Sequence, residues 1–182
     1  MRDIRDMEPT LEQMARSLAE SGDYRLTRRL EPQTEYHPPD NNAKLVAAVA
    51  DVETTGTNPD RDKIIELGIC LFEYGRQTGH IYKVLSSWEW FEDPGFCIPP
   101  EITTITGITD AMVAGHRIND RAVNDLLGRV VLVIAHNADF DRRFLERQLP
   151  AFAAKHWACS RADIDWKAEG IRSSALEFVA YS

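Results

Sequence analysis

Short apolar runs and segments of helical spacing alternate along most of the chain, with turn-forming residues between them. Runs rich in apolar and β-branched residues predict strands at 45–50, 64–72, 81–91, 130–135 and, more briefly, 157–160. Apolar residues spaced by three and four predict helices at 119–129, 138–148 and 173–181. The continuous runs at 45–50 and 130–135 predict strands that are buried on both faces. This order predicts an α/β fold with a mixed sheet flanked by helices, and a loop-rich stretch at 94–115.

The first 42 residues have a different pattern. Leu11, Met14 and Leu18 share one face of a predicted amphipathic helix, and Gly22 is a suitable stop signal. Residues 31–42 contain three prolines among polar residues and predict a linker. We therefore expect a helical N-terminal extension and linker at 1–42 and one main domain at 43–182. The extension either packs on the main domain or docks a partner or nucleic acid.

Charge and composition restrict the function classes. The 182 residues include 21 Lys and Arg against 29 Asp and Glu, a formal net charge of −8. An acidic chain argues against a broad surface that coats duplex nucleic acid, because such surfaces are basic. It does not exclude an enzyme that handles a few nucleotides through bound cations. Three scattered cysteines suit a reducing compartment. No apolar run approaches the ~20 residues of a membrane span, and no apolar segment of a signal peptide follows the charged start. We expect a cytoplasmic protein without membrane contact.

The most informative stretch is the run DVETTG at 51–56, directly after a predicted buried strand. Asp51 and Glu53 are two residues apart, so a strand projects both carboxylates from one face. Two like charges at the end of a buried strand are unfavourable without a cation, and Mg²⁺ or Mn²⁺ prefers such oxygen ligands. The turn formed by Thr54, Thr55 and Gly56 brings small side chains and backbone N–H groups close to any ligand of these ions. The alternative is a strand end with solvated acids.

A second polar cluster, HNADFD at 136–141, follows the other predicted buried strand. Acids in the first turn of a helix are favoured by the helix dipole, which accounts for Asp139 as a helix-start residue. Ligands of open α/β sheets lie at the carboxyl ends of strands, so Asp141 is expected to converge with Asp51 and Glu53. In the same cluster, Asn137 can fix a loop or a nucleotide, and Phe140 can stack on a base or sugar.

Four segments together resemble a known family. The runs VADVETTG at 49–56 and AHNADFD at 135–141 are similar to the first two motifs of the DnaQ-like DEDD 3′–5′ exonucleases, which have a ribonuclease H-like fold. The runs IIELG at 64–68 and PEITTITGIT at 100–109 resemble the second strand and the loop that grips the terminal nucleotide in that family. The resemblance extends over about residues 44–182.

The resemblance implies hydrolysis of phosphodiester bonds at nucleic-acid 3′ ends, with two divalent ions, Mg²⁺ or Mn²⁺, as cofactors. Asp51 matches the ligand of both ions, Glu53 a ligand of the ion that carries the attacking water, and Asp141 the acid on the other ion. The candidate substrate-binding positions are Thr54, Thr55, Gly56, Glu101, Ile102, Thr106, Asn137 and Phe140. Of these, Thr106 stands where the polymerase proofreading subunit of the family has a histidine. The implied partners are single-stranded DNA or RNA 3′ ends and a DNA polymerase subunit.

The third motif of the family, a histidine five residues before a fourth acid, has no match after Asp141. The residue five positions after His156 is Arg161. Asp163 and Asp165 are poor substitutes because they precede the last predicted helix. We expect that the native chain continues past Ser182 and that this chain lacks the motif. The sequence leaves two alternatives open: a non-catalytic nucleic-acid or polymerase-interaction module of the same fold, and an exonuclease that acts on RNA ends.

Overall fold

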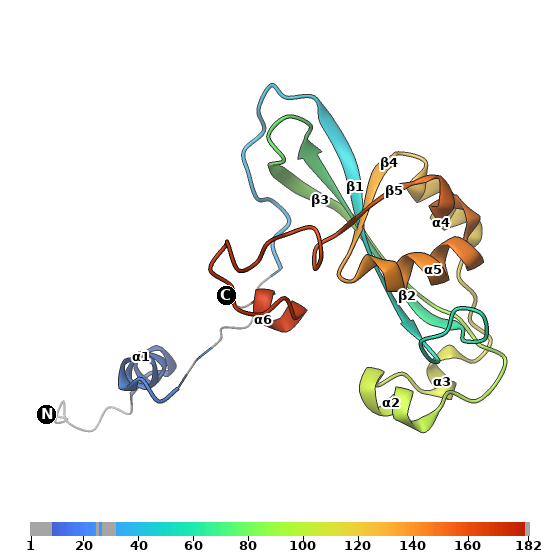
Figure 1. The fold of residues 1–182 in the computed structure, drawn as a ribbon, viewed down its shortest axis with the longest axis horizontal. Helices are drawn as coiled ribbons and strands as arrows, with labels where there is room; N and C mark the ends of the chain where they lie inside the picture. The colour runs from blue at the N-terminus through green and yellow to red at the C-terminus, as the bar shows by residue number, and fades with distance from the viewer. Residues whose placement is uncertain (1–8, 25, 27–31, 181–182) are drawn as a thin grey trace, which may run out of the picture.

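A computed structural model describes residues 9–24, 26 and 32–180, which include a five-stranded mixed sheet with the strand order β3-β2-β1-β4-β5 (Figure 1). The strands are β1 (Lys44–Thr54), β2 (Ile64–Gly75), β3 (Ile81–Phe91), β4 (Val130–Ala135) and β5 (His156–Cys159). Strand β2 is antiparallel to both β1 and β3, whereas β4 is parallel to both β1 and β5. Each strand that the sequence predicts is confirmed, and β1 continues four residues beyond the predicted run at 45–50.

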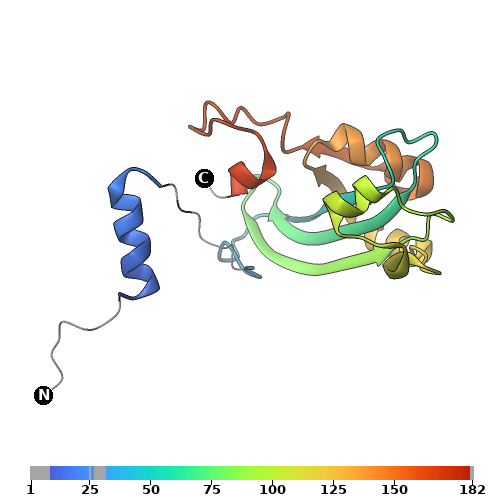
Figure 2. The same cartoon turned by 90° about the horizontal axis from the view of Figure 1, so that it is seen from below.

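The helices are α1 (Leu11–Ser21), α2 (Pro100–Thr106), α3 (Asp110–Val113), α4 (Asp120–Leu127), α5 (Ala138–Gln148), the 3-10 helix η2 (Pro150–Ala154) and α6 (Leu176–Ala180). Side chains of α4, α5 and η2 pack with one face of the sheet into the main core, which contains the fully buried Phe152 and Leu145. A smaller cluster around Ile65 and Ile98 lies beneath α2 and α3. Strands β2 and β3 bend along their length (Figure 2), and two shifts of register interrupt their pairing.

The prediction that residues 45–50 are buried on both faces is wrong at Val49. Ala48 and Ala50 face the main core, whereas Val49, on the opposite face, is 42% exposed. The reason is that α4, α5 and η2 cover only one face of the sheet at this strand. We call the face that carries Val49 the open face.

The expectation of a loop-rich stretch at 94–115 misses two short helices. Pro100 begins α2, and Gly107, with a φ of 77°, ends it. Helix α3 then adds Val113 to the cluster around Ile65 and Ile98. Burial of isoleucine and valine side chains against the sheet stabilises this segment, although its sequence has weak helical preference.

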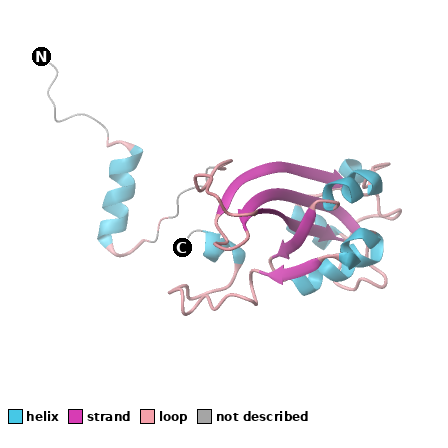
Figure 3. Cartoon of the chain, turned by 90° about the horizontal axis from the view of Figure 1, so that it is seen from above, coloured by secondary structure: helices cyan, strands magenta, loops and turns pink. Residues whose placement is uncertain are grey.

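The N-terminal helix forms where the sequence predicts it, from Leu11 to Ser21. Thr10 caps it in a reciprocal pair of hydrogen bonds with Gln13, and Gly22 ends it with a φ of 78°. No residue of α1 is buried, and the helix stands apart from the sheet (Figure 3). The polar linker lies along β3, because the amide of Tyr36 donates to the carbonyl of Tyr82. The division of the chain after residue 42 stays a prediction.

Three further observations concern the expectations about compartment and termini. None of the helices within the described residues is long and apolar enough to cross a membrane. Cys70, Cys97 and Cys159 are all free thiols. The charged start at 1–6 and the last residue of the predicted helix, Tyr181, lie outside the described residues.

Replacing a buried leucine and an exposed leucine by alanine tests where the core lies. Leu145 is fully buried, whereas Leu11 is 84% exposed. We expect Leu145→Ala to lower the free energy of unfolding by about 2–5 kcal/mol, because it removes buried methyl groups and leaves a cavity. Leu11→Ala should change it by less than about 0.5 kcal/mol. Urea denaturation followed by circular dichroism measures both, and equal effects would contradict the placement of the core.

Candidate active site

Strand β1 presents both of its candidate carboxylates on the open face. Ala50 and Val52 are buried in the main core, so Asp51 and Glu53, which alternate with them, point to the opposite side. The strand ends at Thr54, and residues 55–63 connect it to β2. The i, i+2 spacing therefore has the geometric consequence that the sequence predicts.

Asp141, on helix α5, lies beside these two residues. Its Oδ1 accepts a 3.1 Å hydrogen bond from the backbone N–H of Val52, which lies between Asp51 and Glu53. Parallel pairing of β1 with β4 brings the carboxyl ends of both strands together, and α5 begins directly after β4. Asp141 lies in the first turn of α5 and is only 3% exposed. Asp141 thus lies at the same end of the sheet as Asp51 and Glu53, although it is distant from both in the sequence.

The electrostatics show that three negative charges are unfavourable at this place. Burial, and then the charge of Asp51, raise the pKa of Asp141 to about 7, although the Val52 N–H opposes the shift. Burial also raises the pKa of Asp51, which the charge of His136 partly offsets. The pKa of Glu53 is raised by burial and by the charge of Asp51. A cation between these groups would relieve the repulsion.

The donor set fits a hard divalent ion better than a soft one, because all three groups are carboxylates. Their side-chain positions do not themselves form a ligand set: among the described residues, no three His, Cys, Asp or Glu side chains are grouped closely enough to hold a metal ion. The backbone therefore brings the three residues to one end of the sheet without grouping their oxygens around one point.

The turn after Glu53 uses its own hydroxyl groups for structure. The hydroxyl of Thr54 donates to the carbonyl of Gly56 over 2.6 Å, and that of Thr55 accepts from the amide of Lys63 over 3.0 Å. A Cβ atom at Gly56 would lie 2.5 Å from the carboxylate of Asp62, so a larger residue there would require that carboxylate to move. These three candidate residues fix the shape of the turn beside the acids.

The candidates on α2 lie near the same end of the sheet but in a separate cluster. Glu101 is exposed in the first turn of α2, and Ile102 packs on the cluster that contains Ile65. The hydroxyl of Thr106 donates to the carbonyl of Ile102 and accepts from the amide of Ile108. Ile65, against which Ile102 packs, directly precedes Glu66 on β2, and Glu66 pairs with Glu53 across the strands.

The remaining candidates of the second cluster have mainly local roles. Asn137 has a φ of 82° and begins α5 without a side-chain cap, so it turns the chain from β4 into the helix. The ring of Phe140 packs 5.1 Å from that of Phe144 and against the main core. Asp139 pairs with Arg143 on the surface of α5, in agreement with its interpretation as a helix-start residue.

His136 connects the site to the chain that follows β5. Its two ring nitrogens lie 3.0 Å from the hydroxyl of Ser160 and 2.8 Å from the carbonyl of Ser174. Both nitrogens are therefore engaged in positioning this segment. These two contacts give His136 a structural role.

Sequence reasoning missed Glu66 as a member of the acidic site. Its pKa is raised to about 7 by burial first, then by the charge of Glu89 and a hydrogen bond with it, and then by the charges of Glu53 and Asp51. The available signal was a single glutamate in the apolar run IIELG. Its position opposite Glu53 depends on the strand register, which includes an irregularity between Glu53 and Thr54.

The mixed five-stranded sheet with helices packed against it, and with acids at the carboxyl ends of β1 and β4, defines a ribonuclease H-like exonuclease fold. A family model described as an exonuclease, of the RNase T type, matches residues 48–175. The chain belongs to this exonuclease family, which confirms the resemblance seen in its motifs.

Relatives and solved structures agree with this assignment. A DNA polymerase III of the PolC type from Clostridium perfringens is 38% identical over 104 residues, which cover 56% of this chain and 7% of that protein. The DNA polymerase III epsilon subunit of Treponema pallidum is 32% identical over 101 residues, or 54% of this chain and 44% of the subunit. Exonuclease I of E. coli, in complex with a dT13 oligonucleotide, shares the fold with a TM-score of 0.56 at 18% identity, over 75% of this chain and 35% of its own. The chain spans less than half of the length of each.

The raised pKa of Asp141 predicts how stability depends on pH in a metal-free solution. Because the pKa is about 7 in the folded protein and about 4 in an unfolded chain, the folded state binds the extra proton between these values. The contribution of this proton to stability is complete below pH 4 and is lost as the pH rises through 7. In the wild type, this loss lowers the free energy of unfolding by an amount on the order of 2–4 kcal/mol between pH 4 and pH 7. We expect the Asp141→Asn variant to lack this decrease. Denaturant titrations at several pH values measure it.

Asp125→Asn, at an exposed position on α4, is the matched control and should keep the wild-type pH dependence. The same pH dependence in Asp141→Asn and in the wild type would contradict the proposed environment of Asp141.

Proposed function

We propose that the protein is a metal-dependent 3′–5′ exonuclease that hydrolyses phosphodiester bonds at nucleic-acid 3′ ends. Membership of the exonuclease family supports the reaction class. The observation that supports the choice of residues is the hydrogen bond from the backbone N–H of Val52 to Asp141, which holds the third acid beside Asp51 and Glu53.

In this proposal Asp51, Glu53 and Asp141 would hold two divalent ions, Mg²⁺ or Mn²⁺. Two such metal ions would supply activation of a water molecule and stabilisation of the leaving oxygen of the scissile phosphate. The chain's own contribution is to fix the acids through β1 and α5 and to keep Asp141 out of bulk water. Its net charge of −8 is compatible with a nucleic-acid substrate, because bound cations rather than a basic surface neutralise the reacting phosphate.

We further propose that single-stranded DNA is the substrate and that its 3′-terminal nucleotide lies between the acids and α2. Glu101, Ile102 and Thr106 on α2, together with the turn at 54–56 and with Asn137 and Phe140, are the proposed contacts. E. coli exonuclease I has been solved with single-stranded oligonucleotides, which supports this substrate class. Likeness to PolC and epsilon supports a DNA polymerase subunit as a partner.

The second candidate is a non-catalytic module of the same fold. It is favoured by one observation: the acidic side chains within the described residues are not arranged as a metal-ligand group. Metal binding distinguishes the two candidates directly.

The proposal predicts a specific metal site. We expect isothermal titration calorimetry to detect Mn²⁺ binding whose affinity rises from pH 5.5 to pH 8, because protons on Asp141 compete with the ion until the pH exceeds its pKa of about 7. Asp141→Asn should weaken binding about tenfold or more, while Asp125→Asn leaves it unchanged. Absence of Mn²⁺ binding at pH 8 would favour the non-catalytic module.

Exonuclease activity is tested on single-stranded DNA labelled near its 5′ end, with this chain and with any longer product of the same reading frame. For a product that contains the third motif, we expect release of nucleoside monophosphates that requires Mg²⁺ or Mn²⁺ and stops when a chelator is added. Asp51→Asn should reduce the rate by about a hundredfold or more, because this carboxylate holds the ions that act in the reaction. Asp125→Asn is again the control.

An Asp51→Asn variant as active as the wild type would refute the assignment of this residue. Comparison of deoxyribonucleotide and ribonucleotide oligomers as substrates tests the third interpretation, an exonuclease of RNA ends.

A further inference from the structure

The segment between β5 and α6 forms a loop whose two ends bind the same side chain, that of His136. Nδ1 of His136 lies 3.0 Å from the hydroxyl oxygen of Ser160, and Nε2 lies 2.8 Å from the carbonyl oxygen of Ser174. Ser160 directly follows β5, and Ser174 lies shortly before α6. We call residues 160–174 the β5–α6 loop. His136 itself directly follows β4, so its imidazole joins the end of β4 to both ends of this loop.

The two partners of His136 fix the orientation of its ring. The carbonyl of Ser174 can only accept a hydrogen bond, so Nε2 carries the proton and donates it. In the neutral ring Nδ1 is then an acceptor, and the hydroxyl of Ser160 donates to it. The side chain of His136 is half-buried. A ring whose two nitrogens have different partners on separate segments is held in one orientation.

The two ends of the β5–α6 loop are held unequally. At its start, the amide of Ser160 donates to the carbonyl of Ala135 over 3.0 Å, and the indole N–H of Trp166 donates to the carbonyl of Ser160 over 2.8 Å. At its end, the bond with His136 is the one hydrogen bond that involves Ser174 among the described residues. The start of the loop therefore has independent supports, whereas its end depends on the imidazole.

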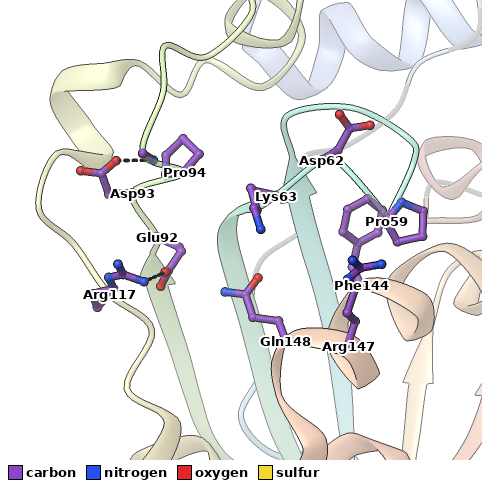
Figure 4. Close-up of a pocket in the computed structure, with 11 residues that line it drawn as sticks. Pro59, Asp62, Lys63, Glu92, Asp93, Pro94, Arg117, Phe144, Arg147 and Gln148 are labelled. Carbon is purple, nitrogen blue, oxygen red and sulfur yellow. Dashed lines mark hydrogen bonds and ion pairs between the residues drawn. The ribbon is translucent and has the colours of Figure 1, made fainter.

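The β1–β2 connection, which also follows the acids of β1, is closed in a different way. Its own ends are joined by the two hydrogen bonds between Thr55 and Lys63. It borders a cavity of about 420 Å³, which is also lined by Gln148 of α5 (Figure 4). No side chain of another element is needed to join the ends of this connection. The β5–α6 loop, by contrast, is closed by an imidazole from outside the loop, so a single substitution can open it.

The β5–α6 loop leads the chain to the side of the sheet that carries the acids. In Figure 1, α6 lies on the opposite side of β4 from α4 and α5. Because α4 and α5 pack on the core face, α6 lies on the side of the open face, to which Asp51 and Glu53 project. Burial raises the pKa of Asp51 and the charge of His136 lowers it, so the imidazole lies near this carboxylate. The same side chain thus borders the acidic site and closes the loop.

We propose that His136 is a positioning residue of the acidic site: by closing the β5–α6 loop, it fixes where α6 begins and holds the chain that follows on the open face, to which Asp51 and Glu53 project. In this role His136 contacts the chain and not the substrate. The effect on catalysis rests on the proposed exonuclease function, whereas the closure of the loop does not.

The first test follows the loop in the whole chain with a chelator present, so that no metal ion contributes. The reporter is the amide of Ile171, which donates to the carbonyl of Trp166 within the loop over 2.7 Å. We expect His136→Ala to speed hydrogen exchange of this amide about fivefold or more, because both bonds that close the loop are lost. Two-dimensional NMR measures the exchange, and amides of β1 and β4 that stay protected show that the sheet remains folded.

His156→Ala is the matched control, because His156 is exposed on β5, and it should leave the exchange of Ile171 unchanged. His136→Gln should restore part of the protection, since its amide N–H can replace the donor to Ser174. If His136→Ala does not fold, Ser160→Ala removes one of the two bonds alone and should give a smaller acceleration. Unchanged exchange at Ile171 in the folded variant, or equal acceleration in His156→Ala, would overturn closure by His136.

The second test measures nucleotide release from single-stranded DNA by a product that contains the third motif. We expect His136→Ala to lower kcat by about tenfold or more while KM changes by less than about threefold, because the loss affects the placement of the chain beside the acids more than the binding of DNA. His136→Gln should recover part of kcat. An inactive wild-type product would refute the proposed function, while the exchange of Ile171 still decides the closure. Wild-type kcat in a variant whose loop is open would refute the positioning role.

Discussion

The hydrogen bond from the backbone N–H of Val52 to Asp141 is the contact on which the site depends. It joins the centre of the acidic run on β1 to the first turn of α5, across 89 positions in the sequence. The donor is a backbone group, so the position of Asp141 is set by the strand itself and not by another flexible side chain. Without parallel pairing between β1 and β4, these two segments would not meet, and the acids of the two motifs would remain separate.

This constraint explains why the site is both buried and electrostatically unfavourable. Asp141 gains one backbone N–H but loses most of its hydration and lies beside two other carboxylates, so its pKa rises to about 7. Glu66 adds a further acid from β2, with its own pKa raised to about 7. A cation bound between acids gathered in this way would relieve both the burial of charge and the mutual repulsion.

Much of the fold could be predicted from sequence because its signals are local. The five strands, α4 and α5 have clear apolar patterns, and the spacing of Asp51 and Glu53 determines that they share a face of β1. The failures arise where the outcome depends on packing between distant segments. Val49 is exposed because helices cover only one face of the sheet, and α2 forms from a segment rich in isoleucine and threonine because Ile102 is buried against Ile65. Glu66 was missed because the register that places it opposite Glu53 is not encoded locally.

The turn at 54–56 lies between the acids of β1 and Lys63, and its hydrogen bonds affect the position of both. Its residues were predicted as ligand contacts, yet their hydroxyl groups are committed to closing the loop: Thr54 to Gly56, and Thr55 to Lys63. The same closure that holds the backbone beside Asp51 and Glu53 also fixes where the side chain of Lys63 leaves the chain. The acids of β1 and the side chain of Lys63 are therefore separated by one loop, whose ends are joined by the two hydrogen bonds between Thr55 and Lys63.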